Sequence, residues 1–344
     1  MKLVFNPSYS SANEYANIIT GYLRENGCTV YSLDELFKSP QKFFSVKIVH
    51  LNWYESVGTL PSFILKLTKL LLLLAFGKKI VWTMHNKTPH TQKVLGLQKV
   101  LQYILVKASK RIVIHSKLSE ELLNNKYKIR KDKIVHIPHP NYINVYGSIP
   151  GSSKKIADKL RLLFLGAVRP YKNIELLIDV VTQFENEVEL HIAGNPITEE
   201  YKNELIGRAI GNNNISFELE FVENNRMIQL LSEYDLAILP YDIRSSLNSG
   251  TIILCFSYAK TIIAPEIGTV SDIEDKSYLF SYKYNDEEEH FKNLKQQVLK
   301  AIEAKKDNSE IFNDWGAKMY EVVKKGYGSN NVQQKFIELY HSLV

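Results

Sequence analysis

The chain alternates short apolar runs with longer segments in which apolar residues recur every three or four positions. The short runs predict strands and the longer segments predict helices. In the first 140 residues the strands are predicted at 2–5, 29–32, 46–51, 79–83, 111–115 and 134–137. The helices between them are predicted at 12–26, 63–76, 97–109 and 118–126. Strands that alternate with helices of this length are typical of βαβ units and a parallel sheet.

The alternation stops at residues 146–155, which contain two Gly, one Pro and three Ser, a composition typical of a linker. Beyond it, strands are predicted at 161–165, 187–193, 215–221, 236–239, 261–264 and 278–281. Helices are predicted at 174–184, 199–209, 226–232, 251–258, 287–304, 311–325 and 332–343. The predicted fold class is therefore α/β, with two doubly wound, Rossmann-like domains that face a cleft. We expect domains at 1–145 and 161–326, a linker at 146–160, and a C-terminal helix at about 327–344 that packs back onto the first domain.

The composition agrees with this organisation and excludes several other classes of protein. A chain of 344 residues is long enough for two domains, and 45% hydrophobic and 23% charged residues are ordinary for a globular protein. Two cysteines exclude a disulfide framework, and the nine histidines show no zinc spacing, so no metal site is predicted. The first residues do not resemble an export signal, so a cytoplasmic location is expected. The net charge of +6 suits an anionic substrate or membrane surface, and no motif indicates nucleic-acid binding.

The first candidate for chemistry is the loop 166–173, between a predicted strand and a predicted helix. Ligands of open parallel sheets bind at such loops, beyond the carboxyl ends of the strands. Lys172 and Asn173 come at or just before the helix N-terminus, which attracts anions, and Arg169 adds a planar fork suited to phosphate oxygens. Gly166 opens the loop. The alternative interpretation is a solvated basic loop.

A second loop of the same kind ends at Ser249, Gly250 and Thr251, where another helix begins. Backbone N–H groups and a hydroxyl are available to an anion there, although Ser249 alone is equally typical of a helix N-cap. Two anion-suited loops at equivalent places in one domain predict a diphosphate site.

Four further residues of the second domain are weaker candidates for nucleotide or sugar contacts. Gly194 follows a strand, where the two interpretations are a contact with a nucleotide and a plain turn. Phe221 and Val222 end the next predicted strand, with a core role as the alternative. Glu266 follows a later strand, and its loop is expected near a sugar of the ligand.

In the first domain the candidate catalytic residue is His85, which leaves a predicted strand. An imidazole there is able to exchange a proton or orient a hydroxyl. Five further residues of this domain, candidates for contact with a second substrate, share a position at the end of a strand or in the loop beyond it. They are Asn6, Ser10, Asn52, Trp53 and His90. His139 lies in a proline-rich segment, where packing is as good an explanation.

The leucine-rich segment 60–79 has two interpretations. It is flanked by lysines and would suit a membrane surface or a lipid-linked acceptor. Its residues 70–75 are apolar on all sides, which favours a buried helix instead.

Several of these segments together resemble a known family. The run Leu163-Phe-Leu-Gly-Ala-Val-Arg-Pro-Tyr-Lys-Asn-Ile-Glu-Leu-Leu-Ile178, then Leu190-His-Ile-Ala-Gly194 and Tyr234-Asp-Leu-Ala-Ile-Leu-Pro-Tyr241, resembles the C-terminal half of family 4 glycosyltransferases of the GT-B fold. Asn248-Ser-Gly250, Ile262-Ile-Ala-Pro-Glu-Ile-Gly268, Thr83-Met-His85-Asn and Ile137-Pro-His139-Pro continue the match in order.

The resemblance implies a transfer from a UDP- or GDP-sugar co-substrate to a glycan acceptor, with no other cofactor. A lipid-linked precursor of a surface polysaccharide is the expected acceptor, met at the inner membrane surface. The resemblance also implies a metal-independent, retaining hexosyl transfer, with Arg169 and Lys172 neutralising the leaving diphosphate. His85 matches the histidine beside the donor sugar.

Three departures from the family pattern are visible. Ala167 stands where the family has an Arg after the Gly, and the loop 6–11 replaces a Gly-rich one. The family's two glutamates would fall at Leu247 and Cys255, which places retention and sugar recognition in doubt. The alternative function is therefore a catalytically inactive nucleotide-sugar-binding or scaffold subunit. A Rossmann oxidoreductase ranks lower, because no G-x-G-x-x-G motif follows the first strand.

Overall fold

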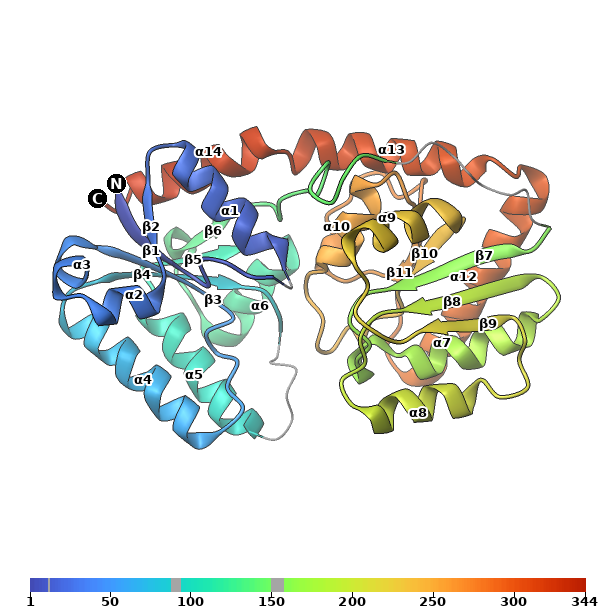
Figure 1. The fold of residues 1–344 in the computed structure, drawn as a ribbon, viewed down its shortest axis with the longest axis horizontal. Helices are drawn as coiled ribbons and strands as arrows, with labels where there is room; N and C mark the ends of the chain where they lie inside the picture. The colour runs from blue at the N-terminus through green and yellow to red at the C-terminus, as the bar shows by residue number, and fades with distance from the viewer. Residues whose placement is uncertain (12, 88–93, 150–157) are drawn as a thin grey trace. The chain divides into compact units, whose positions relative to one another are not determined.

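The computed structural model describes residues 1–11, 13–87, 94–149 and 158–344. The chain forms two compact units (Figure 1). The first unit joins Met1–Pro140 to Tyr327–Val344, and the second unit is Asn141–Gly326.

The first unit contains a parallel six-stranded sheet in the order β2-β1-β3-β4-β5-β6. Its strands are β1 (Lys2–Asn6), β2 (Thr29–Tyr31), β3 (Ile48–Asn52), β4 (Lys79–Met84), β5 (Arg111–Ile114) and β6 (Ile134–His136). Its helices before the linker are α1 (Glu14–Glu25), α2 (Leu33–Lys38), α3 (Pro40–Ser45), α4 (Leu60–Ala75), α5 (Leu95–Ala108) and α6 (Lys117–Tyr127). The predicted strands correspond to these six, whereas the short helices α2 and α3 were not predicted, because six residues are too few to show a helical period.

The C-terminal helix α14 (Ser329–His341) belongs to the first unit. Its residues Val332, Phe336 and Tyr340 are buried in one hydrophobic cluster with residues of β1 and α1. The chain end is also fixed by a hydrogen bond from Lys79 Nζ to the Leu343 carbonyl, at 2.5 Å. The burial of this apolar face stabilises the return of the chain to the first sheet.

The second unit contains another parallel six-stranded sheet, in the order β12-β11-β10-β7-β8-β9. Its strands are β7 (Leu160–Leu165), β8 (Val188–Ala193), β9 (Ile215–Glu218), β10 (Leu236–Ile238), β11 (Ile262–Pro265) and β12 (Phe280–Tyr282). Its helices are α7 (Ile174–Val181), α8 (Glu199–Arg208), α9 (Asn224–Glu233), α10 (Gly250–Ser257), α11 (Gly268–Ser271), α12 (Glu287–Asp307) and α13 (Ile311–Gly326). The strand order reverses between β7 and β10, which is the switch point where ligands of doubly wound sheets bind.

The boundary between the units follows Pro140, five residues before the predicted end of the first domain. The segment after it is hydrogen-bonded into the second unit. Asn141 Nδ2 donates to the Val323 carbonyl at 3.1 Å, and the Tyr142 N–H donates to Ser257 Oγ at 2.9 Å. The Tyr146 N–H donates to Tyr258 OH at 3.0 Å. Of the predicted linker, residues 150–157 lie outside the described residues.

Candidate functional site

Two loops of the second unit meet at the switch point of its sheet. The loop 166–173 follows β7, and the loop 239–249 follows β10, its neighbour in the sheet. Backbone and side-chain hydrogen bonds join the loops. The Asp242 N–H donates to the Tyr171 carbonyl, and Asn173 Nδ2 donates to the Pro240 carbonyl, both at 3.0 Å. The loops are therefore held in one arrangement before any ligand binds.

Among the described residues of these two loops, only Lys172 has a buried ammonium group. Its Nζ donates to Tyr241 OH at 3.3 Å and lies 4.5 Å from the centre of that ring. Burial lowers the pKa of Lys172, and no carboxylate is near enough to offset that effect in the described part of the chain. A buried cation without a counter-charge is costly, and binding of an anion would remove the cost.

The N-terminus of α10 lies beside Lys172. Ser249 caps this helix, since its Oγ accepts from the Ile252 N–H at 3.3 Å and donates to Tyr241 OH at 3.0 Å. The Ser249 N–H is bonded to Thr269 Oγ1 at 2.9 Å. The hydroxyl of Ser249 is thus engaged in capping, and the anion-binding groups of this terminus are the first N–H groups of the helix, at Gly250 and Thr251.

Gly166 leaves a small space between these groups. Its φ is +120°, and a Cβ at this position would lie 3.2 Å from Thr251 Oγ1 and 3.7 Å from Lys172 Nζ. A side chain here would fill the space that Lys172 and Thr251 share, so only glycine keeps it open. Gly166, Lys172 and the start of α10 together form a cradle whose cation and free helix N–H groups suit a phosphate group.

Arg169 and Gly194 have other partners than a ligand. The Arg169 guanidinium is half-buried, and Nη1 donates to the carbonyls of Val168 and Asn195, each at 2.9 Å. A Cβ on Gly194 would lie 1.9 Å from the Gly166 carbonyl oxygen, so glycine is needed there for the close approach of two strand ends. The small size of Gly194 is therefore explained by the approach of Gly166, without a nucleotide. The Arg169 side chain is bonded to the backbone of its own loop and of the loop after β8.

The weaker candidates lie on the loops that follow β9 and β11. Strand β9 ends at Glu218, which pairs with Ala193, the last residue of β8. Phe221 and Val222 therefore lie beyond the end of β9. Phe221 is 57% exposed, so the alternative of a core role is wrong for it.

Glu266 forms ion pairs with Lys276 at 3.0 Å and Lys283 at 3.7 Å, so its charge is already balanced. Leu247 and Cys255 are fully buried, and burial raises the pKa of the Cys255 thiol to about 12, so neither position supplies a negative charge.

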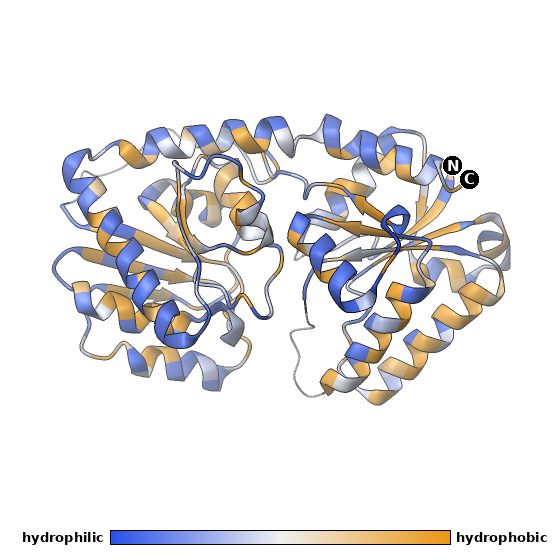
Figure 2. Ribbon diagram, turned by 180° about the vertical axis from the view of Figure 1, so that it is seen from behind, coloured by the Kyte–Doolittle hydropathy of each residue, from blue (hydrophilic) through white to orange (hydrophobic). Residues whose placement is uncertain are grey.

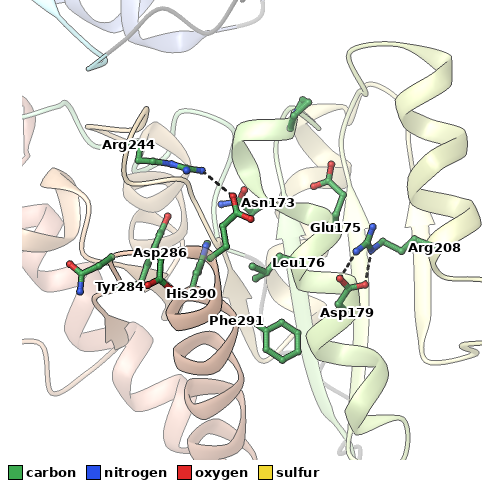
Figure 3. A pocket seen from close by; sticks show the side chains of 13 residues that line it. Asn173, Glu175, Leu176, Asp179, Arg208, Arg244, Tyr284, Asp286, His290 and Phe291 are labelled. Atoms are coloured by element: carbon green, nitrogen blue, oxygen red, sulfur yellow. Dashed lines mark hydrogen bonds and ion pairs between the residues drawn. The ribbon is translucent and has the colours of Figure 1, made fainter.

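A separate pocket of about 420 Å³ lies beside α7 (Figure 3). Its two arginines are already paired with acidic side chains. Arg208 forms a two-pronged bond to Asp179, and Arg244 lies 2.9 Å from Asp242 and 3.7 Å from Glu287. The pocket includes neither Lys172 nor Ser249, so it does not compete with the cradle as an anion site.

In the first unit, aromatic rings from four neighbouring strands gather at the carboxyl edge of the sheet. Trp53 follows β3, His85 follows β4, His115 follows β5, and His139 comes three residues after β6. Tyr15, from the first turn of α1, lies among them, with ring centroids 5.0 Å from His85, 5.4 Å from His115 and 5.1 Å from His139. His115 and Tyr15 were not predicted as site residues, although His115 follows its strand just as His85 does.

His85 is held by two residues that the sequence suggested for acceptor contacts. Its ring stacks on Trp53 with centroids 4.0 Å apart, and its Nε2 lies 3.2 Å from Asn52 Oδ1. Asn52 Nδ2 donates to the Asn6 carbonyl at 3.3 Å, so its oxygen is turned to the imidazole and Nε2 is the donor. Asn6, Asn52 and Trp53 therefore position His85.

Burial, and then the neighbouring imidazoles, place the pKa of His85 well below 6.5, so the ring is neutral at pH 7. Of the other acceptor-side candidates, His139 belongs to the same ring cluster around Tyr15 and Ser10 lies before α1. The Ser10 N–H is bonded to Asn17 Oδ1 at 2.9 Å, in the loop before α1. His139 Nδ1 lies 2.8 Å from the Pro140 carbonyl. His90 lies outside the described residues.

The buried histidines predict that the first unit loses stability in mild acid. Burial lowers the pKa of His50 and His115 to about 3 and that of His139 to about 4, from 6.5. The unfolded chain takes up protons near pH 6.5, whereas the folded chain does so only at much lower pH. The stability is therefore complete above pH 6.5 and falls toward pH 3, by up to about 1.4 kcal/mol per pH unit for each imidazole.

Urea unfolding at pH 7.5, 6 and 5 measures this loss, with Trp315→Phe as the background so that only Trp53 and Trp82 of the first unit report by fluorescence. Equal urea midpoints at pH 7.5 and pH 5 would contradict the prediction.

Known proteins resemble this chain in sequence and in fold. The model of the family Glycosyl transferases group 1 matches residues 148–243, which include Gly166 and Lys172. With its two six-stranded parallel sheets, the chain is a glycosyltransferase with the GT-B fold, and its residues 148–243 are similar to the group 1 type.

Solved structures share the whole fold. Anabaena HepE, crystallised with UDP and glucose, has a TM-score of 0.72 at 13% identity, over 99% of both chains. A glycosyltransferase of Rickettsia africae has a TM-score of 0.70 at 17% identity, over 99% of this chain and 97% of that one.

Two proteins of Xanthomonas campestris pv. campestris, each named GDP-mannose:glycolipid 4-beta-D-mannosyltransferase, are 27% identical to this chain. One match spans 261 residues, 70% of this chain and 71% of that protein, and the other spans 65% of each.

Proposed function

We propose that this glycosyltransferase moves a hexosyl group from a nucleoside-diphosphate sugar to a lipid-linked glycan. The observation that carries the proposal is the buried ammonium of Lys172, which has no carboxylate partner in the described part of the chain and lies beside the N-terminus of α10. A diphosphate leaving group gains negative charge as the sugar–phosphate bond breaks, and a fixed cation in a dry site stabilises that charge.

The names of the relatives support a choice of donor and acceptor to test. The Xanthomonas proteins are named for GDP-mannose and a glycolipid, and HepE was crystallised with UDP and glucose. We propose GDP-mannose as the first donor to test, because the mannosyltransferases are the more similar in sequence. A glycolipid acceptor would also place the chain in the cytoplasm, at the inner surface of the membrane.

Calorimetric titration with GDP-mannose, GDP and a panel of UDP-sugars tests the donor, and a glycolipid acceptor tests transfer. Tight binding of one nucleotide sugar with turnover is the expected result. Binding without turnover for any acceptor would favour the alternative, a nucleotide-sugar-binding subunit. No binding of any nucleotide sugar would end the proposal.

The stereochemistry is a separate proposal, and metal independence stays a prediction of the resemblance. Retention was the expectation from the family. We infer inversion instead, because Leu247 and Cys255 replace the paired glutamates and the relatives are named for a β-linkage. Inversion at an α-linked donor forms the bond from the acceptor oxygen to the anomeric carbon while the bond to the diphosphate breaks. The acceptor proton then needs a base, and neutral His85 is the candidate. Proton NMR of the product, compared with the donor, distinguishes the two outcomes.

Replacing His85 with alanine should lower kcat about 100-fold and leave donor affinity within twofold, because a base acts on the acceptor. The control is His136→Ala, which removes an exposed imidazole at the end of β6 and should change neither quantity. Initial rates and donor titrations measure both. An unchanged kcat in His85→Ala would remove this residue from the mechanism.

A further inference from the structure

Helix α4 exposes an apolar face. Five residues of the helix and its C-cap residue are more than 40% exposed. Their spacing puts them on one side of the helix: Leu60, Ile64, Leu65, Leu71, Leu72 and Phe76. Leu70 and Leu73 take the opposite side and are fully buried. The residues 70–75, apolar on all sides, therefore do not make a fully buried helix. One side packs on the unit and the other meets solvent.

Neighbouring elements widen this surface. Phe44, at the end of α3, is 69% exposed, and its ring lies 6.0 Å from that of Phe76. Helix α5 packs against α4 and exposes Val100 and Tyr103. Figure 2 shows the two helices side by side at the lower right, with apolar residues along both. We call the six α4 residues with Phe44, Val100 and Tyr103 the α4–α5 face.

The sequence segment that forms most of this face is basic, although Lys69 of α4 pairs with Asp34 of α2 at 3.0 Å. Residues 56–119 contain eleven Lys and Arg and no Asp or Glu, whereas the other 280 residues contain 32 basic and 37 acidic side chains. Lys99, Lys107 and Lys110 are exposed on α5 and just after it. The net positive charge of the chain is therefore concentrated in the segment that contains α4 and α5.

We propose that the α4–α5 face docks on an anionic lipid bilayer, with its apolar side chains in the interface and its lysines at the headgroups. The inference deepens the proposed function, because a lipid-linked acceptor would be met at such a surface. The charge argues against a second copy of the chain as the occupant, since two such faces would repel each other. Within the described residues, every helix is too short or too polar to cross a bilayer, so α4 would lie along the surface.

Flotation of the full chain with vesicles tests the apolar part. Vesicles of phosphatidylglycerol and phosphatidylcholine should retain the protein, and vesicles of phosphatidylcholine alone should retain much less. The variant Leu65→Glu/Leu72→Glu should lose vesicle binding. The matched control is Ile197→Glu/Ile210→Glu, which changes two exposed apolar residues of the second unit and should bind like the original chain.

A charge-reversal variant tests the lysines. Lys99→Glu/Lys107→Glu/Lys110→Glu should lower the partition onto anionic vesicles by at least on the order of 100-fold at low salt, since each lysine near such a surface contributes about fivefold. Its control, Lys300→Glu/Lys306→Glu/Lys318→Glu, makes the same change in net charge at exposed positions of the second unit.

The results separate docking from catalysis. Vesicle binding that is equal for both lipid compositions, or unaffected in both face variants, overturns the docking proposal, even where transfer to a water-soluble acceptor proceeds. Vesicle binding that is lost in the face variants and kept in both controls supports it. That support stands even if no donor or acceptor is turned over, a result that would count against the proposed function alone.

Discussion

Replacing Lys172 with methionine is expected to lower kcat/KM about a thousandfold and to weaken binding of the nucleoside diphosphate. Methionine keeps much of the volume and removes the charge that the leaving diphosphate would meet. A single preorganised donor contributes about 100- to 1,000-fold to such a step, and a buried ammonium belongs at the upper end. The thermal stability should stay equal or rise, because the folded chain no longer buries a cation without a counter-charge. Initial rates, calorimetry with the nucleoside diphosphate and thermal unfolding measure these quantities.

Arg169→Met is the matched control, since it deletes the same charge from the same loop. Its guanidinium is bonded to the carbonyls of Val168 and Asn195, so we expect a loss of about tenfold, well below that for Lys172. Equal losses in the two variants would show that both cations contact the diphosphate. A normal rate in Lys172→Met would refute the anion cradle.

Replacing Gly194 with alanine is expected to destabilise the second unit by about 2–5 kcal/mol and to abolish donor binding. The added Cβ would lie 1.9 Å from the Gly166 carbonyl oxygen, and the backbone φ of +146° is one that alanine adopts only with strain. Relief of the clash moves the loop at Gly166, which borders Lys172 and Thr251. Urea unfolding measures the loss of stability. A donor titration at low temperature, without urea, measures the loss of binding.

Gly316→Ala offers a control with the same clash in another place. A Cβ on Gly316 would lie 1.9 Å from the Ala259 carbonyl oxygen, where α13 packs on the turn after α10. A comparable loss of stability is expected, with donor affinity retained in the folded fraction. Donor affinity that is normal in Gly194→Ala, or lost equally in Gly316→Ala, would contradict the specific role of the Gly166–Gly194 approach.

The pattern of apolar and polar residues predicts the secondary structure well, because strands of a parallel sheet are short apolar runs and the helices between them are longer. All twelve strands were predicted to within a few residues. The extension of β9 to Phe221 was wrong, because a strand ends where its partner ends, and β8 stops at Ala193.

The sequence predicted Lys172, Ser249 and His85 as site residues because of their positions relative to the predicted strands. Each follows a strand, and the carboxyl ends of parallel strands meet at one edge of a sheet. Tyr241 was not assigned a role, because its contribution is an oxygen that receives hydrogen bonds from Lys172 and Ser249, and those contacts need the loops to be placed together.

By itself, the sequence determined the two doubly wound units, the loops that carry chemistry and the absence of glutamate at positions 247 and 255. Only the tertiary structure decided how the side chains of those loops are used. Lys172 is buried without a carboxylate, Arg169 donates to the carbonyls of Val168 and Asn195, and Asn52 and Trp53 hold His85. It also decided which side of α4 meets solvent. The physical reason is the same in each case. Periodicity records local spacing, whereas burial and hydrogen-bond partners depend on which strands become neighbours, and β7 and β10 are some 70 residues apart in the chain.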